Sequence, residues 1–180
     1  NHYGRLDVLD NNIGIASNLS VVEESEEYWD RVMEINLKPM FLMSKYAIPA
    51  MISSGDGGSI VNISSISATR PKGLTAYSTS KGAVLSLTQA MAVDHGGEGI
   101  RVNCILPGPV YTPMVYASSS YLNQEGMSSE QRSQRQNASL LQIEGEGWDI
   151  GKAVVYLSSN WARYITCLLY TSDAADDLLC

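Results

Sequence analysis

Residues 59–64 read SIVNIS and residues 100–106 read IRVNCIL, with a long helical pattern over residues 75–95 between them. SIVNIS alternates polar and β-branched residues as a strand does, and the apolar run IRVNCIL is typical of a second strand. Strands joined by a helical crossover of this length pair in parallel, with the helix packed on one face of the sheet. This stretch therefore predicts an α/β fold.

The flanking segments continue the alternation of strands and helices. Residues 7–12 form a short strand pattern, and a helical pattern follows over Ser25–Ser53, with Ser25 as its N-cap. Pro39 has no N–H to donate to the carbonyl four residues earlier, so we expect a kink there. Residues 151–164 again have a helical apolar pattern. The fold class predicted is a parallel sheet with helices on its faces.

Composition narrows the class of protein. The chain has 180 residues, which is enough for one domain, and its 44% apolar and 17% charged residues are a globular balance. A net charge of -7 excludes nucleic-acid binding through a basic face. No apolar run approaches the roughly 18–20 residues that span a bilayer, so we expect no membrane partner. Three cysteines without metal or disulfide spacing predict no metal site and a reduced, cytoplasmic protein.

Residues 113–147 differ in amino-acid composition from the rest of the chain. Within them, residues 117–139 hold no Val, Ile or Phe and many Ser, Gln and Asn, so this stretch cannot contribute much core. A stretch this long in a compact domain is typical of a lid over a site. Ser128 and Gln131 have the spacing of a capping box, which predicts a short helix within the lid.

Both ends of the chain are expected to be truncated. The first strand pattern begins almost at the N-terminus, with no element before it to pair with. Residues 167–180 change in composition and resemble a translated sequencing-adapter read-through, so we predict a non-native tail and exclude it from the fold. The alternative is a native amphipathic helix, because the Leu pairs at 168/169 and 178/179 lie ten residues apart. The predicted domain spans residues 1–166.

One group of residues has the side chains and the spacing that proton transfer requires. Tyr77 and Lys81 lie four residues apart on the helix at 75–95, hence on one face. A cation there favours the phenolate and predicts a lowered pKa for Tyr77. Ser65 follows the strand at 59–64, at the carboxyl edge of a parallel sheet, where ligands bind. Taken alone the Tyr/Lys pair is weak evidence, because surface pairs at helical spacing are common.

Five stretches together occur in the order and approximate spacing of the short-chain dehydrogenase/reductase family. They are Asn-Asn-Ile-Gly (11–14), Ile-Asn-Leu (35–37), Ile-Val-Asn-Ile-Ser-Ser (60–65), Tyr-Ser-Thr-Ser-Lys (77–81) and Arg-Val-Asn-Cys-Ile-Leu-Pro-Gly-Pro-Val-Tyr-Thr (101–112). The family usually has Ala where the first stretch has Ile. The resemblance covers residues 5–166 and implies a Rossmann-like doubly wound parallel sheet, of which the chain holds the C-terminal two-thirds. It also implies an NAD- or NADP-dependent oxidoreductase that interconverts a secondary alcohol and a ketone.

The resemblance assigns a role to each matching residue. Tyr77 would be the general acid/base, Lys81 would lower its pKa and bind the nicotinamide ribose, and Ser65 would polarise the substrate carbonyl, with Ser64 as the alternative. Asn36 would sit at the helix kink and hold a water that links Lys81 to solvent. The cofactor would contact Asn12, Gly14, Tyr77, Lys81, Pro107, Gly108, Val110 and Thr112.

For some of these residues, a purely structural role is the alternative interpretation. Gly14 could serve only to permit a tight turn, and Thr112 could be only a helix-start signal. Asn103 is expected to tie neighbouring loops together, and Cys104 to be inert core.

The chain also departs from the family's pattern. The glycine-rich phosphate loop and the residue that chooses between NAD and NADP are absent, so we expect the chain by itself to fold poorly and show no turnover. The functional alternative is a non-catalytic nucleotide-binding regulator with the same fold. The helix at 75–95 is apolar on more than one side, which suggests a homodimer or homotetramer for the full-length protein.

Overall fold

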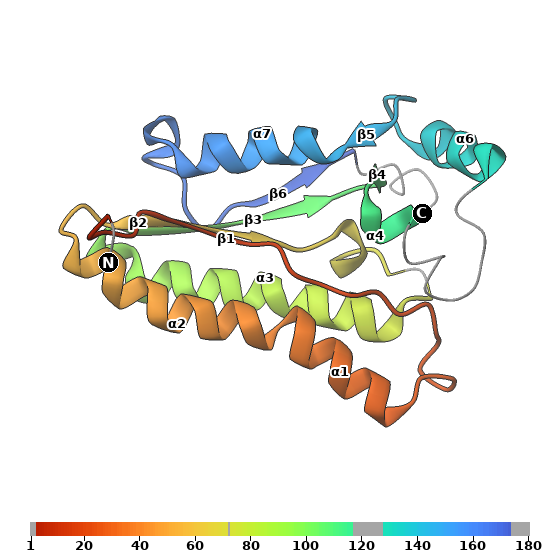
Figure 1. Ribbon diagram of the computed structural model, residues 1–180, viewed down its shortest axis with the longest axis horizontal. Helices are drawn as coiled ribbons and strands as arrows, with labels where there is room; N and C mark the ends of the chain where they lie inside the picture. The colour runs from red at the N-terminus through yellow and green to blue at the C-terminus, as the bar shows by residue number, and fades with distance from the viewer. Residues whose placement is uncertain (1–2, 72, 117–127, 174–180) are drawn as a thin grey trace.

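A four-stranded parallel sheet forms the centre of the molecule. The computed structural model describes residues 3–71, 73–116 and 128–173. The strands β1 (Val8–Asn11), β2 (Gly58–Ile63), β3 (Ile100–Pro107) and β6 (Leu169–Ser172) lie side by side in that order, and each pair is parallel. The predicted α/β fold is confirmed, and Figure 1 shows the strands running in one direction through the molecule.

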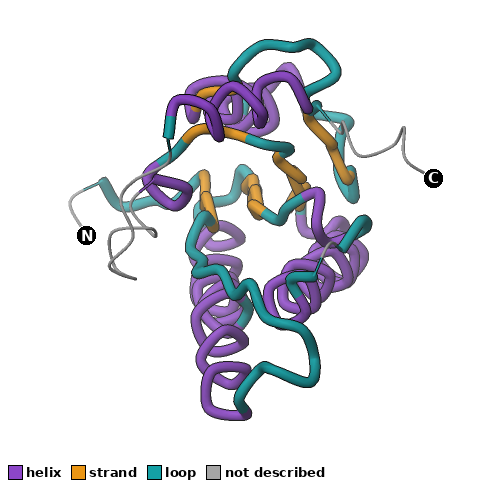
Figure 2. The backbone as a smooth tube through the Cα atoms, turned by 90° about the vertical axis from the view of Figure 1, so that its right-hand side faces the viewer, coloured by secondary structure: helices purple, strands orange, loops and turns teal. Residues whose placement is uncertain are grey.

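Helices cover both faces of this sheet, as a doubly wound fold requires. Three of them, α1 (Glu26–Asn36), α2 (Lys38–Ser53) and α3 (Thr75–His95), lie on one face, and α7 (Gly147–Ser158) lies on the other (Figures 1 and 2). Because both faces are covered, successive residues of β2 are both buried. Ile60 packs with residues of α2 and α3, whereas Val61 packs with Leu157 of α7.

The kink expected at Pro39 is a complete break between two helices. Helix α1 ends at Asn36, Leu37 lies between the helices with φ -113° and ψ -52°, and Pro39 occupies the first turn of α2. A proline is tolerated in a first turn because its missing N–H has no helical partner there. The Ser25 hydroxyl accepts a hydrogen bond from the backbone N–H of Tyr28, so the predicted N-cap is confirmed.

The expectation that residues 167–180 take no part in the fold is wrong for β6. Its residues pair with residues 104–107 of β3, and the backbone N–H of Cys167 donates to the carbonyl oxygen of Val102 over 2.8 Å. Residues 169–172 form a strand and not the alternative helix, because the free edge of β3 offers a ladder of backbone groups to any extended segment. Residues 174–180 lie outside the described part of the chain, and the foreign origin of the tail stays a prediction.

The predicted lid contains several short elements. They are β4 (Val110–Tyr111), α4 (Pro113–Tyr116), α6 (Ser129–Ala138) and β5 (Gly145–Glu146), and β4 pairs with β5 in a small parallel sheet. The capping box of Ser128 and Gln131 is confirmed at the start of α6. Residues 117–127 lie outside the described residues. Three 3-10 turns complete the described elements: η1 (Ile66–Ala68), η2 (Gly96–Glu98) and η3 (Asn160–Ala162).

Candidate active site

The segments that follow β1, β2 and β3 leave the sheet at the same edge, because the three strands are parallel. Residues 12–14 follow β1, Ser64 and Ser65 follow β2, and Gly108 follows β3. Helix α3 packs against η1, which begins directly after Ser65. The fold therefore brings Tyr77 and Lys81 of α3 to the end of β2.

Lys81 is buried at this edge. Its side chain is 4% exposed, its Nζ donates to the carbonyl oxygen of Ile63 over 2.9 Å, and Nζ lies 5.9 Å from the centre of the Tyr77 ring. A charged nitrogen in this position has lost most of its water. Burial lowers the pKa of Lys81 to about 8, and the neighbouring Cys104 opposes this shift.

The two adjacent serines have different partners. The Ser65 hydroxyl lies near enough to the Tyr77 phenol to oppose the rise in the pKa of that phenol, and its Oγ accepts from the backbone N–H of Ser67 over 3.2 Å. The Ser64 hydroxyl instead donates to the backbone carbonyl of Lys81 over 2.7 Å. Of the two hydroxyls, that of Ser65 is therefore the one that lies beside the Tyr77 phenol.

The structure changes the electrostatic picture of Tyr77. We expected the Lys81 ammonium to lower the pKa of the phenol, but burial raises it, and the hydrogen bond with Ser65 is what opposes this rise. The physical reason is the direction of the Lys81 side chain. Its Nζ donates to Ile63 and lies near the Tyr77 ring, and it makes no hydrogen bond to the phenol oxygen.

Asn36 is fully buried at the end of α1 and holds the segment after β1. Its Oδ1 accepts from the backbone N–H of Ile15 over 2.7 Å, and its Nδ2 donates to the carbonyl oxygen of the same residue over 2.9 Å. Nδ2 also donates to the Ser80 Oγ, which in turn donates to the backbone carbonyl of Tyr77. Sequence reasoning missed Ser80 and Ile15 as partners, although Ser80 lies within the Tyr-Ser-Thr-Ser-Lys stretch.

Gly14 faces Lys81 and Asn36 directly. A Cβ atom at Gly14 would lie 3.3 Å from the Lys81 Nζ and 3.4 Å from the Asn36 Oδ1, so the absence of a side chain leaves room for both groups. Its φ is not positive, so packing and not a left-handed turn accounts for the glycine. Asn12 is exposed beside it, whereas Asn11 is buried and donates to Asn62 Oδ1 over 2.9 Å.

The residues after β3 have packing roles in this structure. A Cβ atom at Gly108 would lie 2.3 Å from the carbonyl oxygen of Asp173, so a side chain there would displace the segment after β6. Val110 pairs with Gly145, and the carbonyl of Thr112 accepts from the N–H of Val115 at the start of α4. No hydrogen bond between described residues joins Pro107, Gly108, Val110 or Thr112 to Ser65, Tyr77 or Lys81.

Two residues of β3 have the structural roles that the sequence predicted. Asn103 Nδ2 donates to the carbonyl oxygen of Ile165, and its Oδ1 accepts from the N–H of Leu168, so it fixes the segment before β6. Cys104 is fully buried, and burial raises the pKa of its thiol to about 11. The thiol therefore stays protonated near neutral pH.

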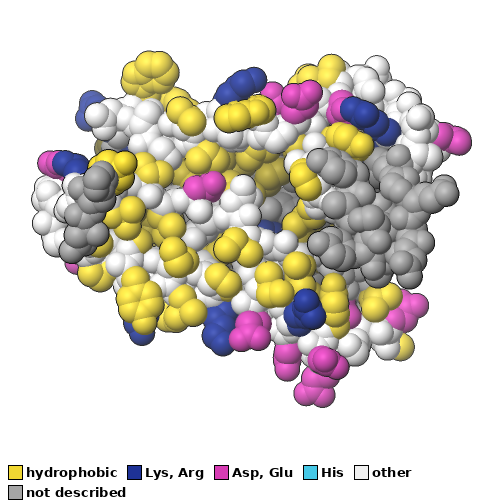
Figure 3. All heavy atoms as spheres, in the orientation of Figure 1, with side chains coloured by type: hydrophobic (Ala, Val, Ile, Leu, Met, Phe, Trp, Pro, Cys, Tyr) yellow, Lys and Arg dark blue, Asp and Glu magenta, His cyan; other side chains and the backbone are white. Residues whose placement is uncertain are grey.

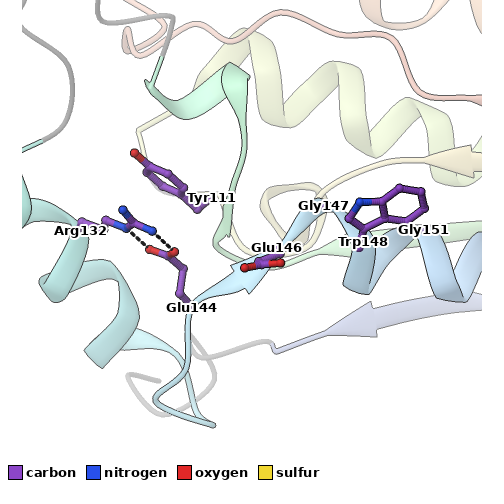
Figure 4. Close-up of a pocket in the computed structure, with 7 residues that line it drawn as sticks. All are labelled: Tyr111, Arg132, Glu144, Glu146, Gly147, Trp148 and Gly151. Carbon is purple, nitrogen blue, oxygen red and sulfur yellow. Dashed lines mark hydrogen bonds and ion pairs between the residues drawn. The ribbon is translucent and has the colours of Figure 1, made fainter.

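An open pocket of about 610 Å³ lies beside the lid elements (Figure 4). Arg132 of α6 forms an ion pair with Glu144, and its guanidinium lies 4.2 Å from the centre of the Tyr111 ring. None of the residues predicted for the site lines this pocket, which sequence reasoning missed because its residues carry no shared motif. The lining is Tyr111, Arg132, Glu144, Glu146, Gly147, Trp148 and Gly151.

Neither a membrane-spanning helix nor a group of metal ligands occurs among the described residues. No helix within residues 3–71, 73–116 or 128–173 combines the length and apolar character needed to cross a bilayer. Over the same ranges, no three His, Cys, Asp or Glu side chains come together as metal ligands would.

Comparisons with known proteins agree with this architecture. The family model described as enoyl-(acyl carrier protein) reductase matches residues 1–174. The chain is 34% identical to the short chain dehydrogenase/reductase astE of Aspergillus oryzae, over 98% of this chain and 67% of that protein. It is 36% identical to the 2-(R)-hydroxypropyl-CoM dehydrogenase of Xanthobacter autotrophicus, over 96% of this chain and 68% of that protein.

A solved structure is similar over nearly the whole chain. The aldohexose dehydrogenase of Thermoplasma acidophilum superposes with a TM-score of 0.89 at 33% identity, covering 99% of this chain and 71% of that one. The chain thus spans about two thirds of the length of these relatives. A chain that the family model matches over residues 1–174, and that superposes so closely on a solved dehydrogenase, belongs to the short-chain dehydrogenase/reductase family of oxidoreductases.

Proposed function

We propose that the protein interconverts a secondary alcohol and a ketone, with NAD or NADP as the hydride carrier. The observation that carries the proposal is the placement of the Ser65 hydroxyl beside the Tyr77 phenol, with the Lys81 ammonium buried next to them at the carboxyl edge of the sheet. A hydroxyl, a phenol and a cation at one point are the groups that a reacting carbonyl oxygen needs.

Each of the three side chains has one task in this proposal. Tyr77 takes the proton of the substrate hydroxyl during oxidation and returns it during reduction. The Ser65 Oγ already accepts from the N–H of Ser67, so its own proton is available to the substrate oxygen. Lys81 holds its ammonium at this edge through the carbonyl of Ile63 and would bind the ribose of the cofactor.

The residues at this edge fit a nicotinamide cofactor. An ammonium group carries three N–H donors, and the carbonyl of Ile63 takes one of those of Lys81. The remaining two suit the paired hydroxyls of a ribose, and the lack of a side chain at Gly14 lets the Lys81 ammonium lie against the segment after β1. The bound nicotinamide would supply the hydride acceptor or donor. Further contacts would come from Asn12, Gly14, Pro107, Gly108, Val110 and Thr112.

The names of relatives support a hydroxylated substrate. The two dehydrogenases compared above are named for an aldohexose and for 2-(R)-hydroxypropyl-CoM, and both names describe a compound with a hydroxyl on carbon. The proposal for this chain is limited to the shared chemistry, an alcohol and its carbonyl partner.

The test is turnover by the protein expressed from the complete reading frame, followed by nicotinamide absorbance with a panel of secondary alcohols and ketones. Tyr77→Phe removes the proton-transfer group and should lower kcat by about 10²–10⁴-fold while cofactor binding persists. Tyr46→Phe, an exposed position on α2, is the matched control and should leave kcat unchanged.

Two outcomes would contradict the proposal. A Tyr77→Phe protein as active as the wild type would remove Tyr77 from the mechanism. Cofactor binding without turnover of any alcohol or ketone would favour the non-catalytic nucleotide-binding regulator instead. Residues 1–180 expressed alone are expected to be inactive, which the same assay checks.

The partners follow from the surface and from the cysteines. Figure 3 shows apolar side chains on the face of the molecule that carries α2, and those exposed on α2 suit a second copy of the chain, in a homodimer or homotetramer of the full-length protein. The net charge of -7 argues against nucleic acid as a partner. The free thiols of Cys104 and Cys167 fit residence in the cytoplasm, where thiols stay reduced.

A further inference from the structure

We infer that Ser64 is a positioning residue of this site, whose hydroxyl fixes helix α3 along strand β2 and so brings Tyr77 to Ser65. The effect on catalysis rests on the proposed function. The effect on the geometry of Lys81 does not, and it is measured separately below.

Three consecutive residues at the end of β2 face α3. The carbonyl of Ile63 accepts from the Lys81 Nζ, Ser64 donates to the Lys81 backbone carbonyl over 2.7 Å, and the Ser65 hydroxyl lies near the Tyr77 phenol. The contacts of Ile63 and Ser65 are with long side chains that can change rotamer. Of the three, only the bond from Ser64 ends on the helix backbone, so it is the one that fixes the position of the helix itself.

The bond from Ser64 has no role within the helix. Lys81 lies in the interior of α3, where its carbonyl already accepts from the N–H of the residue four positions later. The Ser64 hydroxyl occupies the second lone pair of that carbonyl. It is therefore a tertiary contact between strand and helix and not a cap.

Burial makes this contact hard to replace. Ser64 is 3% exposed, so water has little access to the Lys81 carbonyl from that side. The backbone N–H of Ser64 donates to the carbonyl oxygen of Ile105 on β3 over 2.8 Å, so Ser64 is itself fixed to the sheet. Tyr77 and Lys81 lie four residues apart, about 6 Å along the helix axis. A small slide of α3 at Lys81 would therefore be transmitted undiminished to the phenol.

Ser59 provides a matched control on the same strand. It is 2% exposed, and its hydroxyl donates to the backbone carbonyl of Leu157 on α7 over 3.1 Å. Ser59→Ala thus removes a buried hydroxyl bonded to a helix carbonyl, but on the face away from Tyr77. If Ser64 were only a structural residue, the two alanine variants would behave alike.

The experiment compares Ser64→Ala, Ser64→Thr and Ser59→Ala in the protein expressed from the complete reading frame. Ser64→Ala should lower kcat by about 10- to 100-fold, because loss of alignment in an active site costs that much. The limb of the kcat–pH profile assigned to Tyr77 should move to higher pH, because a shift of α3 takes the phenol away from the Ser65 hydroxyl, which opposes the rise in its pKa. Ser64→Thr keeps the hydroxyl and should restore most of the rate, whereas Ser59→Ala should leave kcat and the pH profile unchanged.

A second readout does not depend on turnover. Nuclear magnetic resonance of isotope-labelled lysine side chains follows the titration of Lys81, whose pKa is lowered to about 8. The midpoint should move in Ser64→Ala and stay in place in Ser59→Ala and Ser64→Thr. If the wild type oxidises no alcohol, the proposed function fails, but a titration that moves only in Ser64→Ala still supports positioning. Equal kcat, pH profiles and titrations in the two alanine variants would overturn the inference.

Discussion

The Lys81 ammonium lies between β2 and α3 with the carbonyl of Ile63 as its hydrogen-bond acceptor. A backbone carbonyl carries no net charge, so it compensates only partly for the water that the ammonium has lost. The folded state therefore favours the neutral amine more than the unfolded chain does. The buried ammonium of Lys81 therefore lowers the free energy of unfolding of the protein.

This residue makes the stability of the protein depend on pH. The pKa of Lys81 is lowered from 10.5 to about 8, so between these values the unfolded chain binds more protons than the folded one. Stability contributed by Lys81 should then rise with pH from about 8 upward, and at neutral pH the buried charge costs about 3 kcal/mol.

Lys81→Met isolates the effect, with urea unfolding measured at pH 7 and pH 9.5. The variant should be the more stable protein at the lower pH, and its advantage should shrink at the higher pH. The raised pKa of Cys104 lowers stability above pH 9 in both proteins, and Cys104→Ala in both backgrounds removes this contribution from the comparison. An advantage of equal size at both values would show that Lys81 is not buried as a charge.

At the scale of elements, Arg101 of β3 holds the end of α7. Its guanidinium donates to the carbonyl oxygens of Leu157 over 2.7 Å and of Ser159 and Ile165 over 3.3 Å. These carbonyls lie at and beyond the last turn of the helix, where backbone acceptors lack helical donors. One side chain thereby fixes the helix that covers the second face of the sheet.

Arg101→Ala should lower the free energy of unfolding by about 1.5–3 kcal/mol, the range for hydrogen bonds that involve a charged group. Arg5→Ala is the control, because Arg5 pairs with Asp7 and Asp56 at an exposed position and such pairs contribute little. Chemical denaturation of both variants measures the difference. Equal losses would show that the three carbonyls are satisfied by water.

Most of the elements could be predicted from the sequence, and β6 could not. The strand patterns at 59–64 and 100–106 and the helix at 75–95 follow from periodicity, and the break before α2 follows from Pro39. Residues 169–172 were excluded because of their composition. A strand at the edge of a sheet is selected by the free backbone groups of its neighbour, here β3, and composition says little about that.

In the candidate site, the sequence predicts the side chains that belong to motifs but not the backbone groups to which other side chains bond. Ser65, Tyr77 and Lys81 were found because their side chains belong to linked motifs. The partners of Ser64, Asn36 and Ser80 include backbone groups of Lys81, Ile15 and Tyr77. A backbone acceptor is present in every residue, so no sequence pattern reveals which one is used.

At the scale of the whole molecule, several apolar side chains of α2 are exposed. Tyr46 is 71% exposed, and Phe41 and Met43 are exposed on the same helix. Exposed apolar side chains gathered on one helix are typical of a contact between subunits. A second copy of the chain would bury these side chains in a symmetric helix-to-helix contact.

Tyr46→Glu should shift the full-length protein to a smaller assembly in size-exclusion chromatography with light scattering, because a buried carboxylate without a partner is costly. Val22→Glu, at an exposed position in the segment before α1, should leave the assembly unchanged. An assembly that survives Tyr46→Glu would place the subunit contact elsewhere.

The two hydrogen bonds between the Asn36 side chain and the Ile15 backbone have a consequence for evolution. The bonds from Asn36 to Ile15 involve only the backbone N–H and carbonyl of Ile15, so they do not depend on which side chain stands at position 15. Mutations at this position can therefore accumulate without disturbing the segment beside Lys81.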